Sequence, residues 1–483
     1  MKLVLFNIAD SKQKSRYSSL GLAYIASYLG KYSSGVDTLI LEGNVAEKLR
    51  LIKPDIIGIY AVTQQFNAAE RFARKIREFN RQAVIILGGY HISALPHTLP
   101  EAFDIGVLGE GEETTRQLIN LFNAQGWEKT NLRDIAGIVF REDGRITVNP
   151  QRSLIDDLDR IPFPNRALLS RTLFPNIITS RGCPYKCIFC ASTRFWKKAR
   201  FHSAEYVVSE IEELVGRYKA VHISIWDDLF IADKERFSGI CDLISKRSIQ
   251  KKVSFACALR SNLVDDKLCR DLKRMNITRV SLGFESGSER ILAALKCGSV
   301  SVSDHLKAAR LCKKYGFYVS GTFMIGIPGE QEDDLRSTLQ LIRELKLPGG
   351  GNIALATAFP GTGFWDYAKA RNLVSDNMDF SRLSVMTTDF SSPDKFSGIL
   401  LSDGVPKTRF FALASQIQEE ANKNYILGLM HKGNFSWRYL RLLFYRPRDI
   451  FLIAIFLAKS ILQKKSALMG RYLYYKNNPD ANE

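Results

Sequence analysis

The chain has 483 residues, enough for roughly two to four domains, and its 46% hydrophobic residues are ample for large cores. Its formal net charge is +18, and only eight of its residues are cysteine. The opening residues, MKLVLF, lack the charged and long apolar segments of a secretory signal peptide and indicate a first strand instead. These features argue against a secreted protein.

The first 134 residues alternate strand-like and helix-like segments. Apolar runs of strand length occupy 3–6, 38–41, 56–60 and 84–87, and helical patterns mark 20–29 and 67–77. Such alternation predicts a parallel, doubly wound, Rossmann-like sheet that binds a ligand at the carboxyl ends of its strands. We therefore expect an α/β domain over 1–134.

Three loops near the expected strand ends carry the more specific signal. They are Thr63-Gln64-Gln65, Gly88-Gly89-Tyr90-His91 and Gly109-Glu110-Gly111-Glu112. Taken alone, paired glycines after a strand indicate tight turns. Taken in order, the pieces resemble the cobalamin-binding domain that precedes many radical S-adenosylmethionine (SAM) barrels. The resemblance implies cobalamin contacts from Thr63, Gly88, Gly89, His91, Gly109, Glu110 and Gly111.

One departure from that family concerns the cobalt ligand. The Asp-x-His-x-x-Gly motif, whose histidine binds the lower face of the cobalt in many cobalamin domains, is absent, and residues 37–44 contain no histidine. The lower axial position therefore stays unassigned, and a vestigial or purely structural Rossmann-like domain is the alternative. His91 lies in a glycine turn, where a solvated loop histidine and a direct ligand contact both agree with the sequence.

Residues 135–172 are expected to link two domains. A β-hairpin turning on Asp143-Gly144 is predicted within 135–148. The run 158–164 that follows is too rich in proline for regular structure. This composition is typical of a domain boundary.

Three of the eight cysteines form a compact motif directly after the extended run 176–180. Cys183, Cys187 and Cys190 are separated by three residues and then by two. Thiolates at this spacing can wrap a loop around one inorganic centre and select zinc, copper(I) or iron–sulfur clusters. Structural zinc sites and electron-transfer clusters normally have four protein ligands, so three leave one metal position open for chemistry. The alternative is a zinc site completed by a histidine such as His202.

The same loop resembles the radical SAM signature, Cys-x3-Cys-x2-Cys with an aromatic residue before the last cysteine, here Phe189. The resemblance implies a 4Fe–4S cluster on the three thiolates, with SAM bound to the open iron. Such thiols must stay reduced, so a cytoplasmic location is expected, and the other five cysteines are expected to be buried or inert. A methylthiotransferase would need a second cysteine set upstream, and no cysteine precedes Cys183.

Residues 173–400 return to β/α alternation. Strands are predicted at 176–180, 221–226, 252–259, 278–284, 317–325 and 351–357, with amphipathic helices between them, one of which Ser203 caps. Six β/α units predict a partial (β/α)6 TIM-type barrel with ligands over the carboxyl ends of the strands. The motifs at these ends resemble the family's, which implies SAM contacts from Phe189, Asp227, Asp228, Arg260, Glu285, Ser286 and Gly326.

The resemblance also implies a reaction. A reduced cluster splits SAM into methionine and a 5′-deoxyadenosyl radical that removes hydrogen from an unactivated carbon, and a reductant such as flavodoxin or ferredoxin supplies the electron. With cobalamin, methyl transfer to a small-molecule, natural-product or lipid substrate is expected. The alternatives are a cyclisation, oxidation or rearrangement, and a non-catalytic metal-binding protein. No individual catalytic residue is predicted.

After residue 400 the β/α rhythm stops. Helical patterns occupy 410–421, 437–445 and 450–458, and residues 406–483 hold 13 Lys or Arg against 5 Asp or Glu. The apolar run at 450–458 is too short to span a bilayer. Region 401–483 is expected to be a helical cap on the barrel, with peripheral contact to a membrane or lipidic substrate as the alternative. Nucleic acid is not expected, since no recognisable nucleic-acid module occurs.

Overall fold

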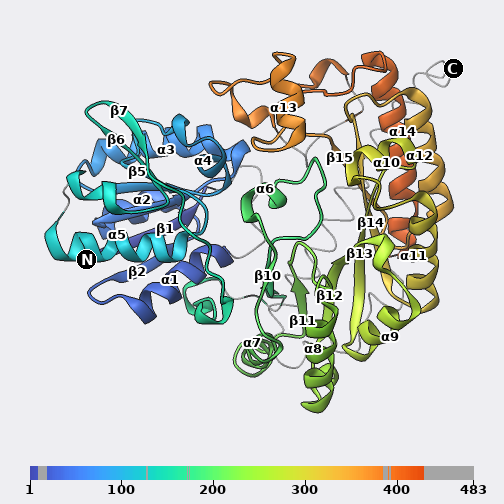
Figure 1. Ribbon diagram of the computed structural model, residues 1–483, viewed down its shortest axis with the longest axis horizontal. Coiled ribbons are helices and arrows are strands. Elements are labelled where there is room, and N and C mark those ends of the chain that lie inside the picture. The colour runs from blue at the N-terminus through green and yellow to red at the C-terminus, as the bar shows by residue number, and fades with distance from the viewer. Residues whose placement is uncertain are drawn as a thin grey trace. The chain divides into compact units, whose positions relative to one another are not determined.

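Figure 1 shows the computed structural model of the chain, which describes residues 1–8, 19–126, 129–170, 172, 174–383, 390 and 393–428. These residues belong to one compact unit, 1–429. Within it the strands form two larger sheets and one short two-stranded ribbon.

The first sheet is seven-stranded and confirms the expected doubly wound fold. Its order is β2 (Asp37–Leu41), β1 (Lys2–Asn7), β3 (Ile56–Tyr60), β4 (Val84–Gly88), β5 (Ile105–Val107), β6 (Ile138–Glu142) and β7 (Arg145–Val148). Strands β1 to β5 run parallel. The helices of this part are α1 (Leu20–Tyr32), α2 (Val45–Ile52), α3 (Phe66–Phe79), α4 (Tyr90–Ala94) and α5 (Gly111–Gln125).

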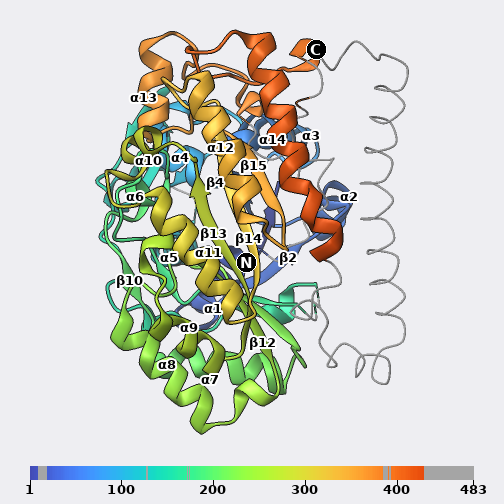
Figure 2. The ribbon, with the colours of Figure 1, turned by 90° about the vertical axis from the view of Figure 1, so that its right-hand side faces the viewer.

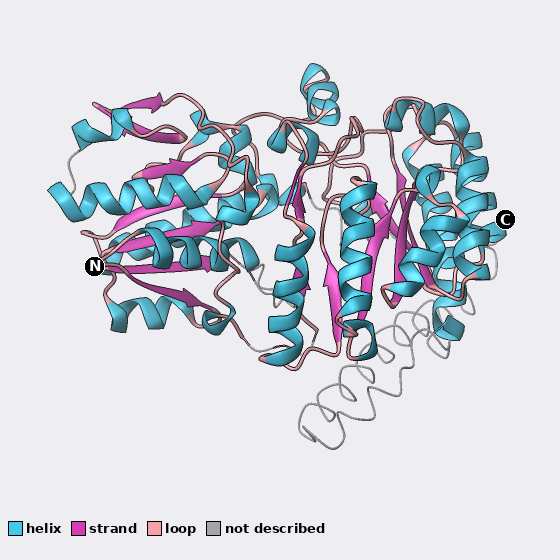
Figure 3. Ribbon diagram, turned by 60° about the horizontal axis from the view of Figure 1, so that its bottom comes forward, coloured by secondary structure: helices cyan, strands magenta, loops and turns pink. Residues whose placement is uncertain are grey.

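Both faces of this sheet are buried, which explains why its strands are apolar runs. Along β1, Val4 and Phe6 belong to one hydrophobic cluster, whereas Leu3 and Leu5 belong to another. Successive side chains of a strand point to opposite faces, so the two clusters are the two faces of the sheet. Figure 3 shows helices on both sides of these strands.

The predicted hairpin on Asp143-Gly144 forms as β6 and β7. It does not belong to a separate linker, because β6 pairs antiparallel with β5 through Ile105 and Phe140. The first sheet therefore continues past residue 134.

The second sheet is the expected partial barrel. It has six parallel strands in the order β15 (Gly351–Leu355), β14 (Tyr318–Ile325), β13 (Ile277–Glu285), β12 (Ser254–Leu259), β11 (His222–Ile225) and β8 (Asn176–Ile177). The strand predicted at 176–180 is interrupted, because β9 (Ser180–Arg181) leaves the barrel and pairs antiparallel with β10 (Arg200–Phe201).

Amphipathic helices connect the barrel strands. They are α6 (Ser192–Trp196), α7 (Ala204–Gly216), α8 (Lys234–Lys246), α9 (Asp266–Arg274), α10 (Glu289–Lys296), α11 (Val302–Lys314), α12 (Glu332–Leu345) and α13 (Gly363–Ala370). The predicted cap of α7 is present, because the Ser203 hydroxyl accepts a hydrogen bond of 3.1 Å from the Tyr206 amide. Asp233 caps α8 in the same way.

The helix predicted at 410–421 lies within α14 (Lys407–Gly428), which runs beside α12 (Figure 2). Phe410, Leu413 and Ile417 belong to the barrel's hydrophobic cluster, so this helix packs on the barrel as expected of a cap. The segments predicted at 437–445 and 450–458 lie outside the described residues. Among the helices that the structure describes, none combines the length and apolar character needed to cross a bilayer.

Candidate active site

A cavity of about 660 Å³ lies between the carboxyl ends of the first sheet and the beginning of the barrel. From the first sheet it is lined by Asn7, Tyr60, Gly88, Gly89 and Gly109. From the barrel side it is lined by Ser180, Arg181, Phe195, Trp196, Trp226 and Asp228. Figure 1 shows α6, which carries Phe195 and Trp196, between the two sheets. The carboxyl edge of the first sheet thus faces the part of the barrel around β9, α6 and the end of β11. Of the predicted SAM contacts and cluster cysteines, Asp228 alone is among the residues that line this space.

The glycine loops line one side of this cavity with backbone that carries no side chains. Gly89 has φ of +117°, and a Cβ atom there would lie 2.4 Å from the Ala61 carbonyl oxygen. Only glycine lets the turn after β4 approach the end of β3 so closely. Gly109, which follows β5, also has a positive φ of +73°. Five predicted cobalamin contacts line the cavity: Gly88, Gly89, Gly109, Glu110 and Gly111.

His91 is placed differently from both alternatives that the sequence allowed. Its side chain is fully buried, with ring centroids of Phe66 and Phe380 at 3.9 and 4.4 Å. Burial lowers the pKa of His91 to about 3, so the ring is neutral. It is a core histidine and does not line the cavity. Thr63, which is 1% exposed, does not line the cavity either.

Glu110 does line the cavity, but arginines occupy its carboxylate. Its Oε1 lies 2.6 Å from Arg181 Nη1 and 3.0 Å from Arg200 Nη2, and Glu112 Oε1 lies 2.5 Å from Arg181 Nη2. All four side chains are buried. Burial alone would raise the pKa of Glu110, but Arg181 and Arg200 outweigh it and hold that pKa below its ordinary value. This junction ion-pair cluster (Glu110, Glu112, Arg181, Arg200) joins the first sheet to β9 and β10.

The cysteine loop follows Arg181 and is held by backbone contacts to the barrel. The Ile188 amide donates to the Leu295 carbonyl at 3.1 Å, and the Gly363 amide donates to the Ile188 carbonyl at 2.9 Å. At the start of the loop Gly182 has φ of +90°, and a Cβ atom there would lie 2.6 Å from the Lys198 carbonyl oxygen. Phe189 packs near Phe364. The ends of α10 and α13 therefore set the path of this loop.

The three cysteines of the loop, Cys183, Cys187 and Cys190, are half-buried. Burial raises the pKa of Cys190 to about 11 and also raises the pKa of Cys183, so both are thiols at neutral pH until a metal displaces the protons. Three sulfur donors fit an iron–sulfur cluster in type. Among the described side chains, no group of three or more His, Cys, Asp or Glu is arranged to hold a metal ion, so ligation by these thiolates stays a prediction.

The candidate fourth ligand of the alternative zinc site is also engaged elsewhere. His202 Nδ1 lies 3.2 Å from Asp159 Oδ1, and its ring stacks on Tyr206 at 3.9 Å. These contacts hold His202 between Asp159, which precedes the barrel, and Tyr206 on α7.

Asp227 and Asp228 follow β11 and have different surroundings. Asp227 is buried and accepts hydrogen bonds from the Thr179 amide at 2.6 Å and from the Ser180 hydroxyl at 2.7 Å. Asp228 is exposed to the cavity, and its Oδ2 accepts from the Gly182 amide at 3.1 Å and the Ser192 hydroxyl at 2.6 Å. Asp228 therefore holds the residues on either side of the cysteine motif.

Arg260 lies directly against the cysteine loop. Its guanidinium carbon is 3.8 Å from the Tyr185 ring centroid, and Nη1 donates to Cys187 Sγ at 3.3 Å. Nη2 donates to the Ser299 hydroxyl at 2.5 Å. Arg260 thus contacts Tyr185 and Cys187 of the loop and also Ser299, which follows α10. Its predicted contact to SAM stays a prediction.

The acidic residue and the serine of the motif at the end of β13 both have partners within the barrel. Glu285 has φ of +65° and pairs through Oε1 with Lys296 Nζ at 3.3 Å. Ser286 is fully buried, and its hydroxyl lies 3.2 Å from Thr338 Oγ1 on α12. Ser286 therefore ties the strand end to α12.

Gly326 is engaged in the turn after β14. It has φ of +77°, and its amide donates to Glu330 Oε2 at 2.7 Å. Glu330 is fully buried, and burial raises its pKa to about 8. The turn is thus built round a buried carboxyl group that the sequence motif alone did not single out.

Comparisons with known proteins agree with this arrangement. Residues 8–119 match the B12 binding domain, and residues 177–342 match the radical SAM superfamily. An uncharacterized methyltransferase of Pyrococcus horikoshii is 32% identical over 371 residues, which are 74% of this chain and 79% of that protein. The chain belongs to the radical SAM family that carries a B12-binding domain. The expected fold class is confirmed, as are a 4Fe–4S cluster, SAM and cobalamin as its cofactors.

Other relatives of this radical SAM enzyme include a cyclase and structurally known methyltransferases. The anaerobic magnesium-protoporphyrin IX monomethyl ester cyclase of Rubrivivax gelatinosus is 28% identical over 438 residues, 85% of this chain and 77% of the cyclase. The radical SAM methyltransferase TsrM of Kitasatospora setae, solved with cobalamin and a 4Fe–4S cluster, superposes with a TM-score of 0.68 at 16% identity over 87% of this chain and 88% of TsrM. The latter likeness concerns the fold.

Two features of the enzyme's site escaped the sequence motifs. Arg181 and Arg200 lie in no glycine or cysteine motif, and only their buried partners mark them. Cys297 was expected to be buried or inert, yet it is exposed and its thiol donates to the Lys186 carbonyl of the cysteine loop at 3.3 Å. The expectation of burial is therefore wrong for Cys297, which caps the end of α10, whereas the expectation that it is inert stays a prediction.

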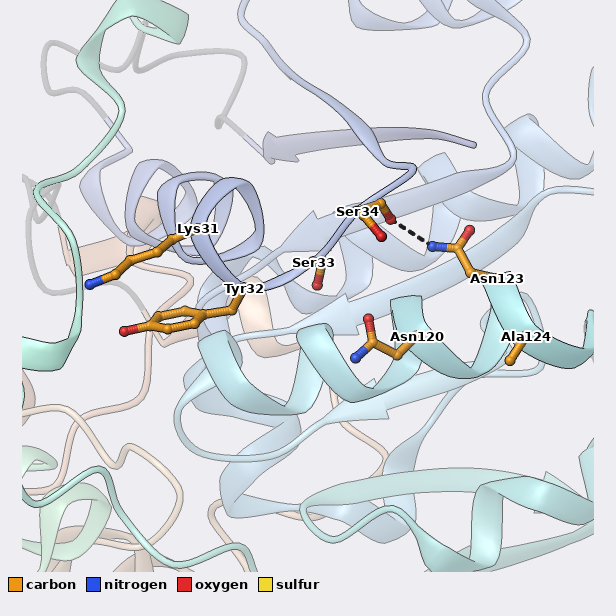
Figure 4. A pocket seen from close by; sticks show the side chains of 7 residues that line it. All are labelled: Lys31, Tyr32, Ser33, Ser34, Asn120, Asn123 and Ala124. Atoms are coloured by element: carbon orange, nitrogen blue, oxygen red, sulfur yellow. Dashed lines mark hydrogen bonds between the residues drawn. The ribbon is translucent and has the colours of Figure 1, made fainter.

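A second depression lies on the first sheet's helices, away from these motifs. It is lined by Lys31, Tyr32, Ser33, Ser34, Asn120, Asn123 and Ala124 (Figure 4). Asn123 spans it by donating to the Ser34 carbonyl at 2.9 Å. None of the predicted site residues lines it, so it has no evident part in the chemistry.

Proposed function

We propose that this radical SAM enzyme transfers a methyl group to an unactivated carbon of a small-molecule substrate, using SAM, a 4Fe–4S cluster and cobalamin. The observation that carries the proposal is the shared cavity, where glycine loops of the B12-binding sheet face Asp228 and the cysteine-loop side of the barrel. When bound, the cluster and SAM supply a hydrogen-abstracting radical, and cobalamin supplies the methyl group.

The chain's own residues have distinct tasks in this proposal. Cys183, Cys187 and Cys190 would hold the cluster, and Asp228 keeps both ends of their loop in place. The bare backbone at Gly89 and Gly109 allows a large flat ring to approach the strand ends.

The other predicted SAM contacts divide into two groups. We assign Phe189, which lies on the cysteine loop, and Glu285, which ends β13 and pairs with Lys296 through one carboxylate oxygen, as SAM contacts. Asp227, Ser286 and Gly326 have hydrogen-bond partners in the fold and position these elements.

Aromatic side chains close the cavity on the barrel side. Phe195 and Trp196 come from α6, and Trp226 follows β11. Their apolar surfaces would exclude water from the reacting carbon, which protects a radical from side reactions.

The partners and location follow from the same chemistry. We propose a one-electron reductant of the flavodoxin or ferredoxin type and a reducing, cytoplasmic compartment, because the cluster thiols must stay reduced. Any membrane contact would come from the basic region beyond residue 428, outside the described residues.

The proposal is tested by anaerobic reconstitution with iron, sulfide and cobalamin. Wild type should gain iron–sulfur and cobalamin absorption, and replacing Cys183, Cys187 and Cys190 by Ala should remove the former and leave the latter. Cys241→Ala, which truncates a buried cysteine on α8, is the matched control. Bound zinc without iron would refute the proposal.

The type of reaction needs a labelled methyl group. Incubation with methyl-deuterated SAM and a small-molecule extract of the source cells should place deuterium in an extracted product. A cyclase, the activity that one relative's name states, would consume SAM and leave the product unlabelled.

A further inference from the structure

Arg260 is a basic side chain in contact with the cysteine motif, and three groups fix its position. It follows β12 and is 8% exposed. Its guanidinium stacks on Tyr185, inside the motif, and donates to Cys187 Sγ at 3.3 Å. Its other end donates to the Ser299 hydroxyl. The planar group is therefore held from both sides, which a flexible ammonium could not achieve.

The positive charge of Arg260 is not cancelled nearby. Among the described residues, no carboxylate forms a salt bridge with it, whereas Arg181 and Arg200 both pair with glutamate. Once Cys187 ligates a metal as a thiolate, its sulfur becomes the anionic partner of this guanidinium. The donor, the distance and the burial already suit a charge-assisted N–H···S bond.

We propose that Arg260 is a positioning residue that raises the reduction potential of the cluster through its hydrogen bond to Cys187. The inference rests on the proposed ligation of the cluster by Cys183, Cys187 and Cys190. Reduction adds one negative charge to the cluster, and a buried cation with a hydrogen bond to a ligand sulfur stabilises the reduced form more than the oxidised form. Hydrogen bonding to sulfur and net charge are established controls of such potentials.

This role differs from the SAM contact that the sequence suggested. Nη1 donates to Cys187 in the loop, and Nη2 donates to Ser299, which follows α10. A contact to SAM would affect the binding of SAM, whereas the N–H···S bond affects the cluster when SAM is absent. Measuring the potential without SAM therefore separates the two roles.

The experiment is an EPR-monitored redox titration of the reconstituted full-length enzyme without SAM. Arg260→Gln should lower the ratio of reduced to oxidised cluster at a fixed potential by at least about tenfold, which is about 59 mV for a one-electron couple. Arg260→Lys keeps the charge without the planar fork and should shift the potential less, in the same direction. Arg247→Gln is the matched control, because Arg247 caps α8 and pairs with Glu205 and Glu212 on the surface.

The outcomes separate this inference from the proposed function. An unchanged potential in Arg260→Gln with full iron content, together with weaker SAM binding, would overturn the inference and leave the proposed function intact. Failure of wild type to assemble a 4Fe–4S cluster would overturn both. If Arg260→Gln does not fold, Tyr185→Leu removes the stacking partner and should also shift the potential negatively; no shift in it or in Arg260→Lys overturns the inference.

Discussion

Glu330 shows how a single buried carboxyl group can close the turn after β14, where the sequence predicts a contact to SAM. Its Oε2 accepts from the amides of Gly326 and Ile327 at 2.7 and 3.2 Å, while Oε1 is buried without a hydrogen-bond partner among the described protein atoms. Burial raises its pKa to about 8, so the protonated form dominates at neutral pH. A neutral acid thus closes the turn without placing a charge in the core.

This protonation predicts a pH-dependent stability. A folded-state pKa of about 8, above the unfolded value, means that the folded chain binds the extra proton, so stability falls as pH rises from about 5 to 8. The contribution is on the order of 5 kcal/mol at most. Glu330→Gln mimics the neutral form and should flatten urea-unfolding stability between pH 6 and 9. Glu332→Gln removes a half-buried carboxylate of α12 that pairs with Arg336 and Arg409 and whose pKa these arginines lower to about 2, so this variant should keep the wild-type slope between pH 6 and 9. An identical slope in Glu330→Gln would contradict the prediction.

At the scale of elements, the junction ion-pair cluster predicts that a small substitution lowers the free energy of unfolding by a large amount. Glu110→Gln leaves Arg181 and Arg200 buried with half their compensating charge, which typically costs about 3–5 kcal/mol. Chemical denaturation of the full chain measures the loss. Glu113→Gln, whose partly exposed carboxylate pairs with Arg116 on α5, should cost about 1 kcal/mol or less. Equal losses of unfolding free energy in the two variants would contradict the expectation that the buried ion pairs contribute more to stability than the partly exposed one.

The same ion-pair cluster predicts how stability depends on pH in acid. The pKa of Glu110 in the folded chain lies below its ordinary value. The ionised carboxylate therefore stabilises the folded chain above the pKa that Glu110 has in the unfolded chain, and this stabilisation is lost as the pH falls through the pKa in the folded chain. Acid should therefore weaken the junction between the first sheet and β9–β10.

The turn between β4 and α4 contains Gly89, a position where we expect only glycine to be tolerated. Gly89→Ala would force a Cβ to within 2.4 Å of the Ala61 carbonyl at φ of +117°. We expect a loss of about 1–3 kcal/mol in stability and a loss of retained cobalamin absorption. Gly88→Ala has no heavy atom within 4 Å of the added carbon and an ordinary φ, so it should keep the stability of wild type. Normal cobalamin retention in Gly89→Ala would contradict this account of the cavity wall.

At the scale of the molecule, periodicity predicts both sheets because apolar runs and amphipathic helices are local properties. It does not predict partners that lie far apart in the chain. Glu110 meets Arg181 and Arg200 across 71 and 90 residues, and His91 is enclosed by Phe66 and by Phe380 from a distant segment. The glycine motifs predicted cobalamin contacts from both Glu110 and His91. In the fold, Glu110 pairs with arginines and His91 packs between phenylalanines.

Asp227 and Asp228 show the same limit over one residue. The sequence treats them as equivalent acids after a strand, and both were expected to contact SAM. At the interruption between β8 and β9, Thr179 and Ser180 donate hydrogen bonds to Asp227. Asp228 instead accepts a hydrogen bond from the Gly182 amide at the start of the cysteine loop. The break in the strand is a tertiary feature, so the division between the two carboxylates could not be read from their order.

A cavity shared by both sheets makes a prediction about the enzyme as a whole. If cobalamin binds there, it stabilises the folded state by about 2.7 kcal/mol at a hundred times its Kd, and the stabilisation reaches every element that lines the cavity. Hydrogen exchange with and without cobalamin should therefore show added protection at the ends of β3 and β4 and also at α6, which belongs to the barrel part of the chain. Helix α9, which contributes no lining residue, serves as the internal reference. Protection confined to residues 1–126 would mean that cobalamin contacts the first sheet alone, and the two sets of motifs would then not share one site.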